Sequence, residues 1–153
     1  MKKIVTTLLI TILTLSGLYA QDLKDVVRDY QRNNSEFTMV IPSFLIKMGL
    51  AFGEMEDEER EAMEMIDNMK IVISENRFGK NDFTALEEGI RKGYFVELMT
   101  VYEQDDKVRM IMNQKSKRKS EMLMIVESKD ENVLMLIDFH GEPDFGKFIT
   151  LAD

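Results

Sequence analysis

The first candidates for chemistry in this sequence are the single histidine, His140, and the acidic residues around it. Asp138, His140 and Glu142 alternate along the chain, and Asp144 follows them. In a continuing strand the first three would share one side, where carboxylates and an imidazole could hold a divalent metal ion. Acidic residues are equally common in polar turns, and Asp144 is well suited to cap a following helix. We favour the interpretation as a polar turn whose acidic side chains face water, and we expect neither a catalytic residue nor a metal site here.

Other catalytic signatures are missing from the sequence. It has no cysteine and no tryptophan, and no glycine-rich loop has either of the familiar phosphate-binding spacings. The 28 acidic residues show no spacing that identifies a glycosidase pair, because such pairs are defined in space. We therefore expect a protein that is not an enzyme and binds no cofactor.

Methionine is unusually frequent, with 13 residues, and three pairs are separated by one residue. The pairs are Met63 and Met65, Met110 and Met112, and Met122 and Met124. In a strand this spacing points both thioethers to one face, whereas in the helix expected around Met63 it sends them to different faces. Thioethers are ligands for Cu(I), but methionine also fills cores and forms adaptable binding surfaces. The core is the favoured interpretation, and a pliable apolar groove and a copper site stay open.

Two charged segments could meet a partner. Lys115, Lys117, Arg118 and Lys119 form a basic loop in an acidic protein, which could contact an anionic head group or an acidic partner. A solvated hairpin tip, whose charges oppose edge aggregation, is the favoured interpretation. The acidic run from Glu54 to Glu61 is typical of a solvated helix face.

The start of the chain predicts export. Lys2 and Lys3 precede an apolar stretch from Ile4 to Leu18, and Ala20 supplies the small residue at a cleavage site before Gln21. The stretch is too short and too rich in threonine for a membrane anchor. Residues 1–20 are thus predicted to be a signal peptide, and residues 21–153 one domain in the periplasm or outside the cell. Without cysteine the protein cannot be a lipoprotein.

Charge narrows the range of partners. Without Lys2 and Lys3, the 20 basic residues become 18 against 28 acidic ones, a net charge of −10. Nucleic acid is therefore excluded as an expected partner, since its binding depends on a basic surface. The sequence does not predict an oligomeric state.

Hydrophobic spacing predicts an α+β domain. Helices are expected over 22–34, 42–52, 54–68 and 82–92, and a last one carries Phe145, Phe148 and Ile149. Strands are expected at 37–41 and 69–74, joined by helix as a parallel pair. Four further strands at 94–102, 108–113, 121–127 and 132–139 form an antiparallel meander, with a longer loop over 114–120. The prediction is one mixed sheet with helices mainly on one face.

These segments resemble a known family across nearly the whole mature chain. The resemblance rests on the strand from Phe37 to Ile41, on Met69-Lys70-Ile71-Val72-Ile73, on Gly93-Tyr94 with Glu97-Leu98-Met99, on Ser120-Glu121-Met122-Leu123, and on Gly141 before the final helix. It points to the domain-of-unknown-function family 4252, small exported proteins of Bacteroidetes. The resemblance implies an α+β envelope domain, and a link to envelope stress signalling by gene neighbourhood. It implies no active-site residue.

The function expected from the sequence is therefore a non-enzymatic interaction module of the cell envelope. Its expected partner is an envelope protein or surface, met through Lys115, Lys117, Arg118 and Lys119. The alternative is binding of a small ligand or of copper in an apolar, Met-lined pocket.

Overall fold

The computed structural model describes residues 22–34, 37–53, 56–75, 83–141 and 143 as one six-stranded antiparallel sheet with four helices. The helices are α2 (Leu23–Asn34), α3 (Ser43–Phe52), α4 (Asp57–Glu64) and α5 (Thr84–Lys92). The strands are β1 (Phe37–Pro42), β2 (Ile66–Glu75), β3 (Val96–Glu103), β4 (Asp106–Ser116), β5 (Lys119–Glu127) and β6 (Glu131–His140). The predicted α+β class and single sheet are confirmed. The predicted signal peptide and the last helix at Phe145, Phe148 and Ile149 lie outside the described residues.

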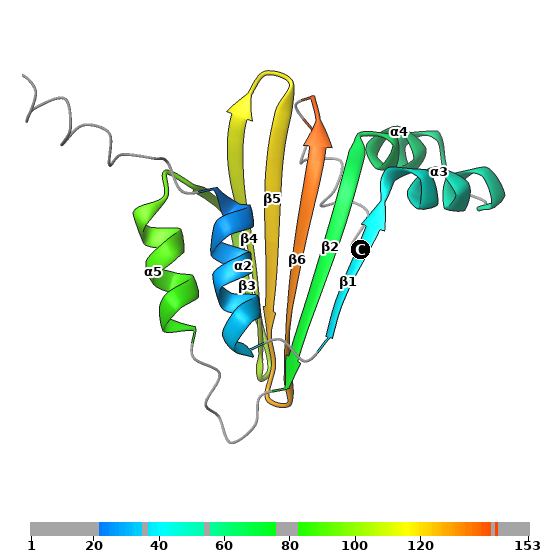
Figure 1. The fold of residues 1–153 in the computed structure, drawn as a ribbon. Helices are drawn as coiled ribbons and strands as arrows, with labels where there is room; N and C mark the ends of the chain where they lie inside the picture. Colours follow the sequence, from blue (N-terminus) through cyan, green and yellow to red (C-terminus); the bar gives the residue numbers. More distant parts are fainter. Residues whose placement is uncertain (1–21, 35–36, 54–55, 76–82, 142, 144–153) are drawn as a thin grey trace, which may run out of the picture.

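The strand order is β1-β2-β6-β5-β4-β3, so β3 to β6 form the predicted meander. The predicted parallel pair is wrong, because β1 and β2 pair antiparallel, with Met39 opposite Ile71. The reason is the connection. A parallel pair needs a crossover that returns the chain along the sheet, but α3 and α4 contact each other at one end of β1 and β2 (Figure 1). The chain therefore re-enters the sheet at the end where it left.

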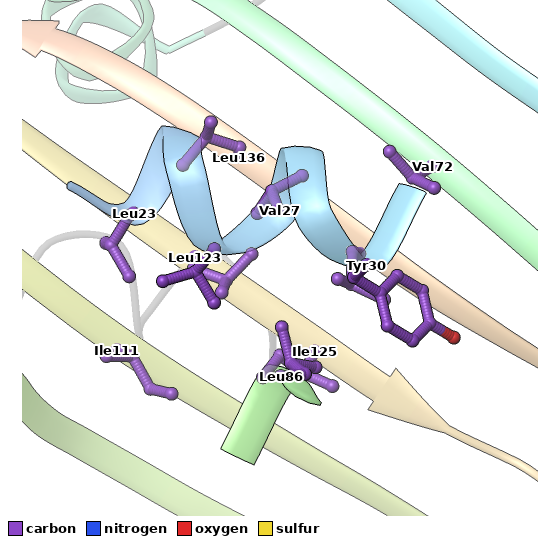
Figure 2. Packing of buried hydrophobic residues seen from close by; sticks show 11 residues of the cluster. Leu23, Val27, Tyr30, Val72, Leu86, Ile111, Leu123, Ile125 and Leu136 are labelled. Carbon is purple, nitrogen blue, oxygen red and sulfur yellow. The ribbon is translucent and has the colours of Figure 1, made fainter. Parts of the chain in front are cut away.

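The first core cluster lies between the sheet and α2, with α5 beside it. Leu23, Val27 and Tyr30 point from α2 toward Leu123, Ile125 and Leu136 of β5 and β6 (Figure 2). These side chains are almost fully buried. The helical spacing of Leu23, Val26, Val27 and Tyr30 produces this contact, since residues three and four apart share one helix face.

Tyr30 closes one end of this cluster. Its hydroxyl lies 2.7 Å from Ser74 Oγ, and its ring stacks on Phe83 with centroids 5.5 Å apart. Burial raises the pKa of Tyr30 above its ordinary value of 10.0, because the phenolate would lose its hydration.

The raised pKa of Tyr30 predicts a loss of stability at alkaline pH. Its contribution is complete below the unfolded pKa of about 10 and is lost as pH rises through the higher folded pKa. Tyr30→Phe should lower the free energy of unfolding by about 1 kcal/mol at neutral pH, because the hydrogen bond between Tyr30 and Ser74 is lost. It should also make the free energy of unfolding fall less steeply as pH rises above neutral. Urea unfolding from pH 7 to 11 checks this. The control is Tyr94→Phe, which should leave the pH dependence of the free energy of unfolding unchanged, because Tyr94 is 90% exposed. The same pH dependence for wild type and Tyr30→Phe would contradict the prediction.

Candidate functional site

The face of the sheet opposite α2 is apolar across all six strands. Strand register places its side chains in three rows, each crossing β1, β2, β6, β5, β4 and β3 in that order. We call these residues the Met face: Ile41, Met69, Ile137, Met122, Met112 and Val96; Met39, Ile71, Met135, Met124, Met110 and Met99; Phe37, Ile73, Val133, Val126, Val108 and Val101. Of the methionines that the structure describes, eight lie here: Met39, Met69, Met99, Met110, Met112, Met122, Met124 and Met135.

The Met face is more exposed than the face under α2. On the edge strands Phe37 is 52%, Met39 41%, Val96 57% and Val101 42% exposed. Most of the central positions are half-buried, and Met110, Met122 and Ile137 are buried. Soluble proteins rarely expose apolar patches beyond a few hundred Å², and larger ones mark binding surfaces. The Met face is therefore the leading candidate for a binding site.

Helices α3 and α4 border the Met face at one end. Their main sheet contacts are with β1 and β2 (Figure 1). Ile46 and Leu50 of α3 also belong to a second core cluster, which includes Phe139 of β6. Met63 and Met65 also pack against this cluster. They were expected on different faces of one helix, but α4 ends at Glu64 and Met65 is its C-cap.

The paired methionines of the strands all fall on the Met face. Met112 lies directly opposite Met122, and Met110 opposite Met124; Met124 also lies opposite Met135. Side chains in such cross-strand pairs have Cβ atoms about 5 Å apart. The structure thus brings together thioethers that the sequence shows only as separate pairs. The Met face holds buried methionines, as the core interpretation requires, and also exposed ones, as a groove or a copper site would require.

The predicted basic loop is largely strand. β4 runs to Ser116 and β5 begins at Lys119, so the loop expected over 114–120 is a tight turn with Lys117 and Arg118 at its tip. Ser116 pairs with Lys119 in register, which extends the hairpin beyond the predicted strand ends. The turn residues and Lys119 are exposed.

Lys115 differs from the rest of this loop. Its Nζ lies 2.8 Å from Asp22 Oδ2 and 2.8 Å from Oε1 of the buried Glu121. Burial acts to lower the pKa of Lys115, but hydrogen bonds and charge from both carboxylates outweigh it and raise that pKa. Lys115 therefore holds α2 near the β4–β5 hairpin, while Lys117, Arg118 and Lys119 form the exposed part of the predicted patch.

A polar cavity of about 140 Å³ lies beside these charges. Lys24 of α2 contacts Asp138 at 2.9 Å and Glu121 at 3.7 Å, and Asp138 lies directly opposite Glu121 on the neighbouring strand. This network was not predicted from the sequence, because α2 and the two strands are far apart in the chain. Its arrangement is that of an ion-pair cluster that fixes α2 on the sheet.

His140 is at the exposed end of β6, with Nδ1 2.9 Å from Asp67 Oδ1. Asp138 is engaged with Lys24, and Glu142 and Asp144 lie outside the described residues. Within 22–34, 37–53, 56–75, 83–141 and 143, no group of three or more His, Asp or Glu side chains is arranged to hold a metal ion.

Arg109 is a buried cation that sequence reasoning did not single out. It pairs with Glu87 of α5 and lies 2.9 Å from Glu97 Oε2 of β3. Burial acts to lower the pKa of Arg109, but both carboxylates outweigh it and raise that pKa. The i,i+2 apolar pattern around Arg109 gives no signal for such a contact. Its role is to hold α5 against the sheet.

None of the helices in the described part of the chain is long and apolar enough to cross a membrane. No significant match to a curated protein or to a solved structure was found. The family described as domain of unknown function (DUF4252) matches residues 30–146, a span from the end of α2 past the end of β6. This chain is therefore a member of the DUF4252 family.

Proposed function

We propose that this protein is a non-enzymatic interaction module of the cell envelope and that it binds a protein partner through the Met face. The observation that carries the proposal is the apolar surface across six strands, half-buried at most of its central positions and exposed at most of its positions on β1 and β3. Methionine is flexible and polarisable, so such a surface can adapt its shape to a partner. The predicted signal peptide supports placement in the periplasm or outside the cell.

The basic turn takes a secondary part in this proposal. With Lys115 engaged by Asp22 and Glu121, the exposed charges of Lys117, Arg118 and Lys119 can steer an acidic partner surface during encounter. A contribution of this kind affects the association rate and weakens with salt. The family resemblance makes envelope stress signalling the first pathway to examine.

Two neighbouring residues of β1 provide the test of the proposal. Met39 is 41% exposed on the Met face, whereas Val40 is 53% exposed and shares the opposite face with Lys70. Lysine is tolerated on edge strands. Met39→Lys therefore adds one positive charge to the Met face, and Val40→Lys adds the same charge to the opposite face. We expect Met39→Lys to lose a cross-linked envelope partner that wild type and Val40→Lys retain. Equal recovery by both variants would overturn the proposal.

A second candidate is Cu(I) binding, which the cross-strand methionine pairs favour. Met110, Met124 and Met135 follow one another across β4, β5 and β6, and soft thioethers select Cu(I). Anaerobic titration with a competing Cu(I) chelator is the measurement. A copper site predicts at least tenfold weaker binding for Met124→Leu, a change that conserves apolar volume, and no change for the control Met48→Leu on α3. Equal Cu(I) affinity of Met124→Leu and Met48→Leu would exclude the site.

A further inference from the structure

A groove on the α2 side of the sheet, opposite the Met face, has features of a small-molecule site. The main sheet contacts of α2 are with β5 and β6, and β2 and β1 extend beyond it to the edge of the sheet (Figure 1). The groove lies beside α2 and has a volume of about 320 Å³, at the lower end of the range for ligand pockets. Three cations, Lys24, Arg28 and Lys70, line it together with Asn68, Asp138 and two aliphatic residues. The groove is therefore cationic in a protein that is acidic overall.

The three cations of the groove are balanced unequally. Lys24 Nζ lies 2.9 Å from Asp138 Oδ2, and Arg28 donates to Asp25 Oδ1 at 2.7 Å. Within the part of the chain that the structure describes, no carboxylate pairs with Lys70. Burial lowers the pKa of Lys70, and the positive charge of Arg28 lowers it further. Lys70 thus leaves one positive charge of the groove unbalanced.

Two other partly buried cations show the usual arrangement. Lys115 and Arg109 each contact two carboxylates, which raise the pKa of both side chains despite their burial. A charge removed from water costs free energy unless it is paired. Lys70 departs from this arrangement because its charged neighbour has the same sign. An anion in the groove would supply the missing partner.

Strand register determines the surroundings of Lys70. Val40 of β1 lies directly opposite it on one side, and Leu136 of β6 lies opposite it on the other. Leu136 is buried, whereas Val40 is 53% exposed. Val40 therefore offers apolar surface beside the unbalanced charge, and a ligand that uses both features has an anionic group and a hydrocarbon part.

The charge balance indicates which anion fits. One unbalanced positive charge matches a carboxylate, whereas a phosphate monoester carries about 1.5 to 2 negative charges at neutral pH. From these observations we infer that the groove binds a small aliphatic carboxylate, with its carboxylate at Lys70 and its hydrocarbon part on Val40. This site lies on the other side of the sheet from the Met face and goes beyond the proposed function.

Small ligands that differ in one feature test the inference. The probe is hexanoate. Its controls are hexanol, which has no charge, hexylammonium, which has the opposite charge, and acetate, which lacks most of the hydrocarbon part. Amide NMR titration of isotope-labelled protein, produced from the full chain, should show shifts at Asn68 and Lys70. Hexanoate should bind at least fivefold more tightly than any control, and its binding should weaken as salt rises.

Protein variants locate the binding site. Lys70→Met removes the charge from an unbranched side chain and should weaken hexanoate binding at least tenfold. Lys117→Met removes the same charge from the exposed β4–β5 turn and should change binding less than twofold, as should Met39→Lys on the Met face. Lys70→Met should be at least as stable as wild type in urea unfolding, because it removes an unpaired, partly buried charge. Lys70→Gln repeats the test with a neutral polar side chain if Lys70→Met fails to fold.

Several outcomes would overturn the inference. Equal binding of hexanol would mean attraction by the hydrocarbon part alone, and tighter binding of hexyl phosphate than of hexanoate would mean that the anion is not a carboxylate. Unchanged hexanoate binding by Lys70→Met, or shifts confined to the Met face, would place the site elsewhere. The absence of saturable hexanoate binding to wild type would also refute it. Partner capture through Met39 does not depend on these results, so failure of the carboxylate site and failure of the proposed function can be told apart.

Discussion

Leu134→Ala should lower the free energy of unfolding by about 2–5 kcal/mol, the range for truncating a buried leucine. Leu134 is 0% exposed and belongs to the first core cluster under α2. Its neighbour Met135 is half-buried on the Met face, so Met135→Ala should cost about 1 kcal/mol, because less apolar area leaves the protein interior.

Urea unfolding of both variants measures the difference. The two residues are adjacent on β6, so local backbone effects of alanine are matched. Similar losses from both substitutions would mean that the Met face is packed as tightly as the core, which would contradict its assignment as a binding surface.

Lys115→Ala should destabilise the protein by about 1–3 kcal/mol, whereas Lys117→Ala should change stability by less than about 0.5 kcal/mol. Glu121 has only 3% of its side chain exposed, and without Lys115 its nearest cation is Lys24 Nζ at 3.7 Å. A buried carboxylate that loses its partner costs more than an exposed ion pair gains. Lys117 stands at the exposed turn and serves as the control.

Thermal or urea unfolding of the two lysine variants decides this point. If Lys115→Ala were as stable as Lys117→Ala, the charge network between α2 and the hairpin would contribute nothing. Lys115 would then be an exposed member of the basic loop, as predicted from the sequence.

The parts of the fold that sequence predicted well are those set by local spacing. The stripe of Leu23, Val26, Val27 and Tyr30 gave α2, and alternation gave the four strands of the meander. The pairing of β1 with β2 was predicted in the wrong direction, because it depends on how α3 and α4 pack rather than on either strand. Local alternation carries no information on such packing.

The candidate site was visible in the sequence only in fragments. The pairs at Met110 and Met122 indicated one face of a strand, but their alignment into rows with Met99 and Met135 depends on register across four strands. Long-range pairing likewise placed Lys115 beside Asp22, 93 positions away. Charge content predicted a basic patch but could not separate an exposed lysine from one paired with Asp22 and the buried Glu121.

Site-specific photo-crosslinking tests the central claim, partner binding through the Met face, most directly. A photo-reactive phenylalanine analogue replaces Met39 in one protein and Val40 in another, and both are irradiated in intact cells of the source organism. We expect a partner adduct from position 39 that is at least tenfold more abundant than any adduct from position 40. Equal adducts from both positions, or an adduct from position 40 alone, would contradict it.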